Sequence, residues 1–242
     1  MNTWKFVSKP SVRTYTIQNQ KLSVQMRENV FPPSGNGLFV AQNIKIFPEE
    51  RVIDIGTGTG ILGILAAKLG GKVVATDTSK EAVELTKQNA QFNKVFLNVQ
   101  KGPYFAGFKQ AFDVIIANLP QELVLPSQQK SIGKQQLKSF SGGPLGNQQI
   151  LELLGIAKKN MHSKSRFYLL VSTQTDYART IQKMLSNYDA TLFAFRSCSV
   201  KPFMAENPKT YCQLNQEGKT HIFKENQKWK SNQYLFELSL KE

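Results

Sequence analysis

The chain has 242 residues, of which 40% are hydrophobic and 10% aromatic, a composition that excludes a disordered protein and predicts a globular one. One α/β domain of this length can bury a sizeable core. No apolar run approaches the roughly 18–20 residues that span a bilayer, and the first residues lack the apolar region of a signal peptide. Two cysteines are too few for a disulfide framework or a zinc site. We therefore expect a cytoplasmic protein with no metal site and no membrane contact.

The chain is strongly basic, with a formal charge of +14 and a pI near 9.7. Such a charge favours an anionic partner, such as RNA or an acidic protein surface. The lysines are nevertheless scattered over most of the sequence, whereas a nucleic-acid footprint gathers them on one face. Charge alone therefore leaves both an anionic partner and simple solubility open.

The first 37 residues predict an extension and a loop that precede the main fold. Polar and β-branched residues alternate through residues 1–29, which predicts two short strands joined near residues 18–21. We interpret 1–29 as an N-terminal β-hairpin extension and 30–242 as the main domain. Residues 30–37 are rich in Pro and Gly and form a loop, and Leu38–Phe47 has helical spacing that ends at Pro48.

From residue 51 onward, apolar strands alternate with amphipathic helices. Strands are predicted for the run that ends at Asp54 and for Lys72–Asp77, Val95–Gln100, Phe112–Ala117, Phe167–Ser172, Ala190–Phe195 and Tyr234–Leu240. Helices are predicted after the glycines at 56–60, after a capping box of Thr78 and Glu81, and for Asn147–Met161 and Asp176–Ser186. Residues 126–144, with Lys130, Lys134 and Lys138, are predicted as a long loop, and 199–232 as an extended connection.

This alternation predicts a Rossmann-like α/β fold, in which right-handed crossovers place helices on both faces of a parallel sheet. The last strand differs because apolar and polar residues alternate in it, as they do in edge or antiparallel strands.

The turn after the first parallel strand carries glycines at alternate positions, Gly56, Gly58 and Gly60. A dinucleotide-binding turn has the spacing Gly-x-Gly-x-x-Gly, but here Ile61 occupies the third glycine position. Asp54, two residues before Gly56, would repel a pyrophosphate and suits a ligand with a cationic end. These features disfavour a nicotinamide-dependent oxidoreductase and favour a sulfonium cofactor, S-adenosyl-L-methionine.

An acid also ends the second parallel strand. Asp77 lies 17 residues after Gly60, on the strand expected beside the first, where a carboxylate can accept hydrogen bonds from both ribose hydroxyls. A helix N-terminal acid that only interacts with the helix dipole is the simpler alternative.

The stretch Val52–Gly60 closely resembles the first motif of class I S-adenosylmethionine-dependent methyltransferases. The stretch Asn118-Leu119-Pro120-Gln121, after the fourth parallel strand, resembles the Asn-Pro-Pro-Tyr motif of N-methyltransferases that act on glutamine amides of release factors and ribosomal proteins or on rRNA bases. The resemblance spans about residues 30–195 and implies a seven-stranded sheet. It also implies that the cofactor is bound by Asp54, Gly56, Thr57, Gly58, Gly60, Asp77, Thr78 and Asn118.

The fourth motif has a chemical rationale. A conjugated NH₂ group is a poor nucleophile because its lone pair is delocalised. The Asn118 side-chain oxygen and a backbone carbonyl near Pro120 can accept its two protons and direct the lone pair. Gln121 stands where relatives have an aromatic residue that stacks on a planar target, and Glu122 adds an acid that could pair with an amine or take its proton. We assign Asn118, Pro120 and Glu122 as catalytic.

Two further stretches match the family in place and type. Phe31 and Pro32 correspond to a Phe-x-Pro segment that covers part of the substrate pocket, and with Leu119 and Gln121 they are the predicted substrate contacts. Residues 141–146 resemble a glycine-rich segment that opens the fourth helix of release-factor methyltransferases. No acid follows the third parallel strand where the family often has one, so no adenine ligand is predicted.

We expect methyl transfer to an amide or amine nitrogen of a protein or peptide. Alternative hypotheses are an RNA base methyltransferase, which the basic charge favours, and a small-molecule amine N-methyltransferase, which Gln121 and Glu122 favour. A non-catalytic module that only binds the cofactor is also possible. The sequence does not predict the oligomeric state.

Overall fold

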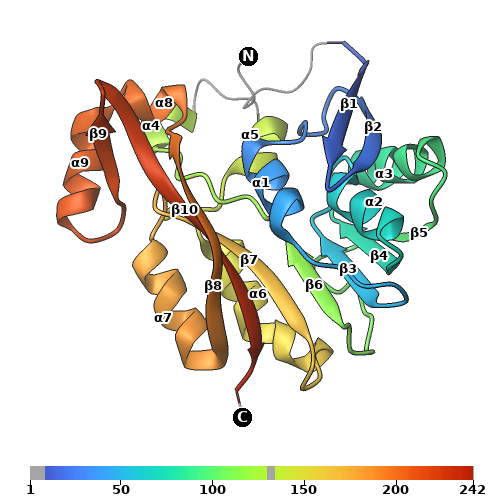
Figure 1. Ribbon diagram of the computed structural model, residues 1–242. Coiled ribbons are helices and arrows are strands. Elements are labelled where there is room, and N and C mark those ends of the chain that lie inside the picture. Colours follow the sequence, from blue (N-terminus) through green and yellow to red (C-terminus); the bar gives the residue numbers. More distant parts are fainter. Residues whose placement is uncertain (1–8, 130–133, 242) are drawn as a thin grey trace. The chain divides into compact units, whose positions relative to one another are not determined.

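The computed structural model describes residues 9–129 and 134–241 (Figure 1). Its contacts divide the chain into two compact units. The first runs, in its described part, to Asn118 and also contains Ala157–Leu169, and the second contains Leu119–Ile156 and the described residues from Leu170 onward. The division of the chain into an extension over 1–29 and a domain over 30–242 stays a prediction. Within the described ranges, every helix is too short or too polar to cross a membrane.

The first unit begins with the predicted β-hairpin, drawn in blue in Figure 1. Strands β1 (Ser11–Ile17) and β2 (Gln20–Met26) pair antiparallel. Gln18 and Asn19 link them with positive φ angles of 49° and 61°, the geometry of the tight turn that matches strand twist. Side chains at the C-terminal end of α3 (Lys80–Phe92) fasten the hairpin, since Asn89 Oδ1 accepts from the backbone N–H of Gln25 at 2.8 Å.

The first unit contains the predicted parallel sheet. Its strand order is β5-β4-β3-β6-β7, and each strand runs parallel to its neighbours in this order. The strands are β3 (Arg51–Ile55), β4 (Lys72–Asp77), β5 (Leu97–Lys101), β6 (Val114–Ala117) and the start of β7 (Arg166–Ser172). At its centre Ile53 pairs with Val74 on one side and Ile115 on the other. All four residues of β6 are buried, as expected for a parallel strand covered on both faces.

Two helix starts in this unit differ from the prediction. Helix α1 covers Gly35–Asn43 and not Leu38–Phe47, because the Ser34 side chain caps it by accepting from Gly37 N. Helix α3 is capped by Ser79 and not by Thr78, since Ser79 Oγ accepts from Ala82 N and donates to Glu81. Helix α2 (Ile61–Lys68) follows the glycine turn as predicted.

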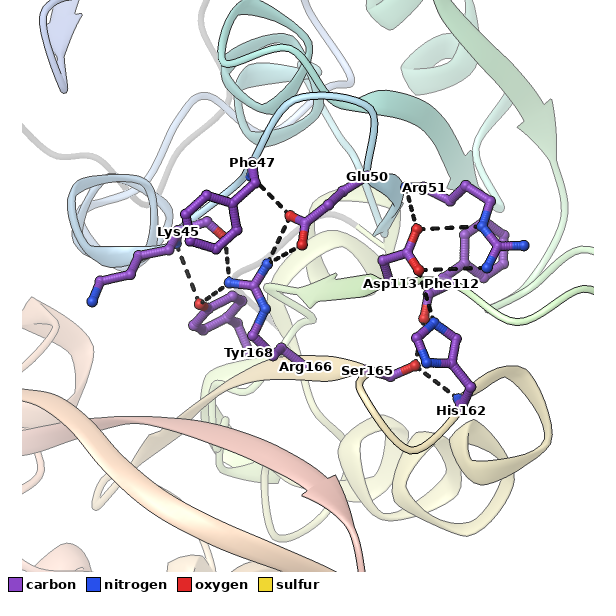
Figure 2. Close-up of polar contacts among 10 residues, drawn as sticks. All are labelled: Lys45, Phe47, Glu50, Arg51, Phe112, Asp113, His162, Ser165, Arg166 and Tyr168. Atoms are coloured by element: carbon purple, nitrogen blue, oxygen red, sulfur yellow. Dashed lines mark hydrogen bonds and ion pairs between the residues drawn. The ribbon is translucent and has the colours of Figure 1, made fainter.

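Polar side chains join the amino-terminal ends of the parallel strands in the first unit (Figure 2). Asp113, just before β6, accepts from the backbone N–H of Arg51 at 2.7 Å and from His162 Nε2 at 2.7 Å. The Arg51 guanidinium also lies 3.3 Å from the Asp113 carboxylate. Partial burial alone would raise the pKa of Asp113, but hydrogen bonds from Arg51 and His162 outweigh it and lower the pKa to about 2.

A second group in Figure 2 extends this edge to β7. The Arg166 guanidinium donates to both oxygens of Glu50, at 2.6 and 2.7 Å. It also donates to the Lys45 carbonyl at 2.9 Å and to the Tyr168 hydroxyl at 3.1 Å. Fork-shaped pairs of this kind are geometrically specific, so they fix where β3 and β7 begin.

The second unit contains the rest of the sheet. The end of β7 is followed in the strand order by β10 (Lys228–Leu240) and β8 (Tyr188–Ser199), and β9 (Ile222–Glu225) pairs with β10. Strand β10 runs antiparallel to β8, as its alternating sequence predicted. The remaining elements are α4 (Pro126–Gln129), α5 (Lys134–Phe140), α6 (Gln148–Ile156), α7 (Tyr177–Asn187), α8 (Pro202–Ala205) and α9 (Pro208–Gln216).

Two predictions for this unit are wrong. Residues 126–144 contain helices α4 and α5 instead of one loop, although Lys130 lies outside the described residues. Residues 199–232 contain α8, α9 and β9 instead of an extended connection. Pro202 and Pro208 stand at the first positions of α8 and α9, where a missing N–H costs nothing.

Candidate functional site

The glycine turn connects β3 to α2 in left-handed backbone geometry. Gly56, Gly58 and Gly60 have φ angles of 71°, 57° and 84°, which other residues adopt at a cost. The backbone N–H groups of Gly56 and Thr57 donate to the carbonyl of Thr76 at 2.9 and 3.0 Å. The turn is therefore held against the end of the neighbouring strand β4.

Gly58 and Gly60 face different surroundings. A Cβ atom added to Gly60 would lie 2.9 Å from the Thr86 side chain, so packing requires a glycine there. A Cβ added to Gly58 would meet no atom within 4 Å. Backbone groups on the open side of Gly58 can therefore be approached closely by a ligand.

Asp54 lies beneath the turn and is fully buried. Its Oδ2 accepts from Thr57 Oγ1 at 2.6 Å and from Gly63 N at 2.9 Å, while Oδ1 has no partner among the described residues. Burial raises the pKa of Asp54 to about 6, although the bonds from Thr57 and Gly63 lower it in part. Asp54 thus stabilises the turn from inside the protein through Oδ2, while its Oδ1 stays unpaired.

Asp77 ends β4 beside the same turn and is partly exposed. Its Oδ2 accepts from the backbone N–H of Gly58 at 3.0 Å, and its Oδ1 from that of Ser79 at 2.9 Å. Burial raises the pKa of Asp77, and these backbone hydrogen bonds lower it in part. A carboxylate offers about four acceptor positions, so Asp77 keeps capacity for hydroxyl donors. The adjacent Thr78 is exposed.

Asn118 follows β6 and ends the first of the two segments that make up the first unit. A Cβ added to Gly37 would lie 3.1 Å from Asn118 Nδ2, so the Asn118 side chain lies against the first turn of α1. The predicted substrate residues Phe31 and Pro32 precede that helix, with Pro32 buried and Phe31 partly exposed. Within the first unit, Asn118, the start of the fourth motif, therefore lies next to helix α1, which follows Phe31 and Pro32 in the sequence.

The rest of the fourth motif belongs to the second unit. Leu119, Gln121 and Glu122 are buried and Pro120 is partly exposed. The backbone N–H of Glu122 donates to Phe140 O at 2.9 Å, and its carbonyl accepts from Gly142 N at 3.1 Å. The Glu122 carboxylate lies 3.4 Å from Lys201 Nζ, a partner 79 positions away that sequence reasoning missed.

The glycine-rich segment 141–146 packs against this motif within the second unit. A Cβ added to Gly142 would lie 2.1 Å from Gly146 O and 2.9 Å from Gln121 Cα. These contacts are far too short for any side chain, so Gly142 lets two backbone segments touch. The sequence resemblance singled out this segment, and its packing explains why glycine is needed.

A loop after β5, residues 102–108, was not predicted to belong to the site. Thr76 Oγ1 donates to the carbonyl of Tyr104 at 2.6 Å, which holds the loop at the end of β4. Tyr104 and Ala106 both have a φ of 46°, an uncommon left-handed conformation for residues other than glycine. Strained backbone of this kind gathers at functional sites. The only signal in the sequence was its closely spaced Gly102, Pro103 and Gly107.

Residues 37–132 match the family model of ribosomal protein L11 methyltransferase, PrmA. The ribosomal protein L11 methyltransferase of Dictyoglomus thermophilum is 37% identical over 113 residues, which are 46% of this chain and 38% of that protein. A protein of Methanocaldococcus jannaschii with the provisional name protein N5-glutamine methyltransferase is 27% identical over 170 residues, 69% of this chain and 85% of that protein. The chain spans less than half the length of the L11 methyltransferases that it matches.

Solved structures give the same fold. The 16S rRNA guanine-N2 methyltransferase of T. thermophilus, solved with AdoMet and guanosine, superposes with a TM-score of 0.60 at 12% identity, over 97% of this chain and 52% of that one. At this identity the likeness concerns the fold alone. Together with the strand order and the glycine turn, these matches show that the chain has the class I methyltransferase fold and resembles S-adenosylmethionine-dependent methyltransferases.

Proposed function

We propose that the chain is an S-adenosylmethionine-dependent methyltransferase that transfers a methyl group to an amide or amine nitrogen of a protein or peptide. The observation that carries the proposal is the hydrogen bond from Gly58 N to Asp77 Oδ2, beside the open side of Gly58. It brings the acceptor oxygens of Asp77 and the open side of Gly58 together at the ends of two neighbouring strands.

The residues present fit the cofactor. Asp77 has acceptor capacity for two ribose hydroxyls, and Gly58 leaves its backbone open to close approach. The turn at Gly56, Thr57 and Gly60 supplies the surrounding backbone. The unpaired Oδ1 of Asp54 adds negative charge beneath the turn when the group is ionised. When bound, the cofactor supplies an electrophilic methyl group on a cationic sulfur.

Asn118 and the backbone that follows it are the proposed acceptor groups. The Asn118 side-chain oxygen and the carbonyl of Leu119 or Pro120 would each accept one N–H of the target nitrogen. Acceptors of this kind would stabilise the positive charge that develops on the nitrogen in the transition state. Losing one such group typically costs about 10²–10³ in rate. Phe31, Pro32, Leu119 and Gln121 stay the predicted substrate contacts, and the catalytic role of Glu122 stays a prediction.

The sequence relatives support a protein acceptor. They are named for methylation of ribosomal protein L11 and of protein N5-glutamine. Both names therefore give a protein as the acceptor, and the second gives a nitrogen as the target. A second candidate, an RNA base methyltransferase, is favoured by the net charge of +14.

The two candidates can be separated with fractionated acceptors. Ribosomes are split into protein and RNA fractions, each is incubated with the enzyme and methyl-tritiated cofactor, and label is counted after protease or nuclease treatment. We expect protease-sensitive label in the protein fraction. Label that only nuclease removes would establish the second candidate instead.

The cofactor role is tested separately by calorimetry with S-adenosylhomocysteine. We expect the wild type to bind and Asp77→Ala to lose at least about tenfold in affinity, since a charge-assisted hydrogen bond contributes about 1.5–3 kcal/mol. Absence of binding by the wild type would end the proposal. Equal binding by Asp77→Ala would remove Asp77 from the ribose site.

A further inference from the structure

One face of the sheet formed by β8, β10 and β9, the strands drawn in orange and red in Figure 1, carries aromatic side chains. Residues directly opposite each other in antiparallel strands share a face, and alternate residues along one strand do so as well. We call this face the aromatic face. Its members are Lys228, Lys230, Asn232, Tyr234 and Phe236 in β10, Leu192, Phe195, Ser197 and Ser199 in β8, and Phe223 and Glu225 in β9.

Apolar side chains on the aromatic face are exposed, whereas the other face of the same strands is packed. On the packed face, Ser231, Gln233 and Leu235 are at most 1% exposed. On the aromatic face, Phe195 is 68% exposed and Leu192 is 49% exposed. An antiparallel sheet with one solvated face normally turns polar residues outward, and exposed apolar patches mark interaction sites. The aromatic face is therefore suited to a partner that covers its rings.

The rings of the aromatic face lie among polar groups. The ring centroids of Tyr234 and Phe236 are 6.4 Å apart, and Phe195 is the residue opposite Tyr234. Beside these rings, Ser197 Oγ donates to Asn232 Oδ1 at 2.7 Å. Rings that each stack on one base, next to hydroxyl and amide groups that reach base edges and 2′-hydroxyls, are typical of surfaces that bind single-stranded RNA. A duplex hides the faces of its bases, so only an unpaired strand can use such rings.

Positive charge gathers at one end of the aromatic face. The β9–β10 hairpin, residues 222–231, contains three lysines and one acid, Glu225. Lys230 forms an ion pair with Glu225, whereas Lys228 is exposed and has no ion-pair partner among the described residues. The whole chain has a formal charge of +14. This charge attracts a phosphate backbone and leaves Lys228 available to contact it.

A second copy of the chain fits the aromatic face less well. Strand β8 is the last in the strand order of the described sheet, so a second copy could pair along its edge. The register of β8 with β10 shifts at Phe193, which is left over between Leu192 and Ala194. A bulge of this kind twists an edge strand away from further pairing. Two copies of a strongly basic chain also repel each other.

We propose that the aromatic face binds single-stranded RNA, with Phe195 and Tyr234 stacking on bases and Lys228 contacting a phosphate. The proposal goes beyond the proposed function, because every residue that carries it belongs to the second unit and none is a predicted cofactor or acceptor residue. Binding here docks an RNA strand and does not by itself make a base the methyl acceptor.

The first test measures the fluorescence anisotropy of a labelled oligouridine with the full chain at low salt. Phe195→Ala should weaken binding at least about tenfold, since one base stack is lost. Phe96→Ala is the matched control, because Phe96 is 85% exposed but lies in the first unit. It should change the affinity by less than about twofold. Both variants should melt at the wild-type temperature, because neither ring is buried.

The second test follows the salt dependence of the same binding. Lys228→Ala should reduce the slope of log affinity against log salt by about 0.7, the value for one phosphate contact on a single strand. Lys87→Ala, at an exposed position of α3, should leave the slope unchanged. An RNA duplex of the same length and the matching oligodeoxyuridine should both bind more weakly than oligouridine.

Several outcomes would overturn the proposal. They are the absence of oligouridine binding by the wild type at low salt, equal losses in Phe195→Ala and Phe96→Ala, and equal or tighter binding of the duplex or of oligodeoxyuridine. A dimer in sedimentation that Phe195→Ala abolishes would assign the face to a second copy instead. Phe195→Ala should bind S-adenosylhomocysteine like the wild type, so failure of this proposal is distinguishable from failure of the proposed function.

Discussion

The Oδ2 atom of Asp77 accepts a hydrogen bond of 3.0 Å from the backbone N–H of Gly58. The bond joins the end of β4 to the middle of the glycine turn, although the two residues are 19 positions apart. It fixes the carboxylate at Gly58, where an added Cβ would meet no atom within 4 Å. The same contact therefore positions both the carboxylate and the open space of the proposed cofactor site.

Replacement of Gly58 by Ala should weaken cofactor binding by more than its effect on folding. The φ of +57° strains an alanine by about 1 kcal/mol, and the new Cβ would occupy the open space. Gly218→Ala is the matched control, since Gly218 has a φ of +71° and its added Cβ also meets no atom within 4 Å. We expect similar losses of stability in both variants, measured by denaturant unfolding, but a large loss of S-adenosylhomocysteine affinity only in Gly58→Ala. Equal calorimetric affinities would contradict the role of Gly58.

Asp54 should make the protein less stable as the pH rises from about 4 to 6. Its pKa is raised from 3.8 to about 6 in the folded state, so the unfolded chain releases its proton first. The contribution of Asp54 is therefore fully present below pH 3.8 and is lost as the pH rises through about 6. The loss corresponds to about 3 kcal/mol at most. Unfolding free energies of wild type and Asp54→Asn, measured from pH 4 to 8, should differ by a term that levels off above about pH 6. Parallel pH profiles would rule this out.

Asp113 should behave in the opposite way. Its pKa is lowered to about 2, so its stabilising contribution is present above the unfolded value near 3.8 and is lost as the pH falls toward 2. Because the side chain is 26% exposed, solvent screening limits the effect to about 1 kcal/mol. Asp113→Asn should remove this acid-sensitive term in urea unfolding between pH 2 and 5 and leave cofactor binding unchanged. A change in binding would show that the amino-terminal edge is coupled to the glycine turn.

Gly142→Ala should distort the fourth motif, which packs against the glycine-rich segment, and should leave the glycine turn unchanged. The added Cβ would overlap the backbone oxygen of Gly146 at 2.1 Å, and overpacking against backbone costs about 3 kcal/mol or more. Gly155→Ala, in α6 of the same unit, is the control because its Cβ meets nothing within 4 Å. That variant should be neutral or more stable by up to about 1 kcal/mol. Methyl transfer should fall in Gly142→Ala while calorimetric affinity for S-adenosylhomocysteine persists, and normal transfer would refute the packing argument.

The parallel sheet was predictable because its strands carry local signals. Strand β6 is a run of apolar residues that is buried along its whole length. Strand β3 contains an acid near its end and is followed by three spaced glycines. Both strands are therefore recognisable without knowledge of their neighbours. The turn geometry also follows locally, since alternate glycines permit the positive φ angles that are found. Helix α5 was missed because its residues are mostly polar and give no apolar period.

The contacts of the fourth motif could not be predicted from local signals. The pairing of Glu122 with Lys201 joins residues far apart in the sequence, and no local pattern specifies it. Gln121 looked like a polar loop residue, and polar loop residues are usually exposed. Its burial depends on the glycine-rich segment that packs on its backbone, so only the folded chain shows that the residue is buried.

The parallel sheet of the first unit has two unlike edges, and the clusters of Figure 2 lie at one of them. At the amino-terminal edge, Asp113 and Arg166 have their charges matched by close partners. At the opposite edge, Oδ1 of Asp54 has no hydrogen-bond partner among the described residues, and a Cβ added to Gly58 would meet no atom within 4 Å. The two edges should therefore respond differently to substitution. Substitutions at the amino-terminal edge should change the thermal stability of the protein, and substitutions at the opposite edge should change its affinity for the cofactor. Natural variation at the amino-terminal edge would then adjust the working temperature without altering the chemistry.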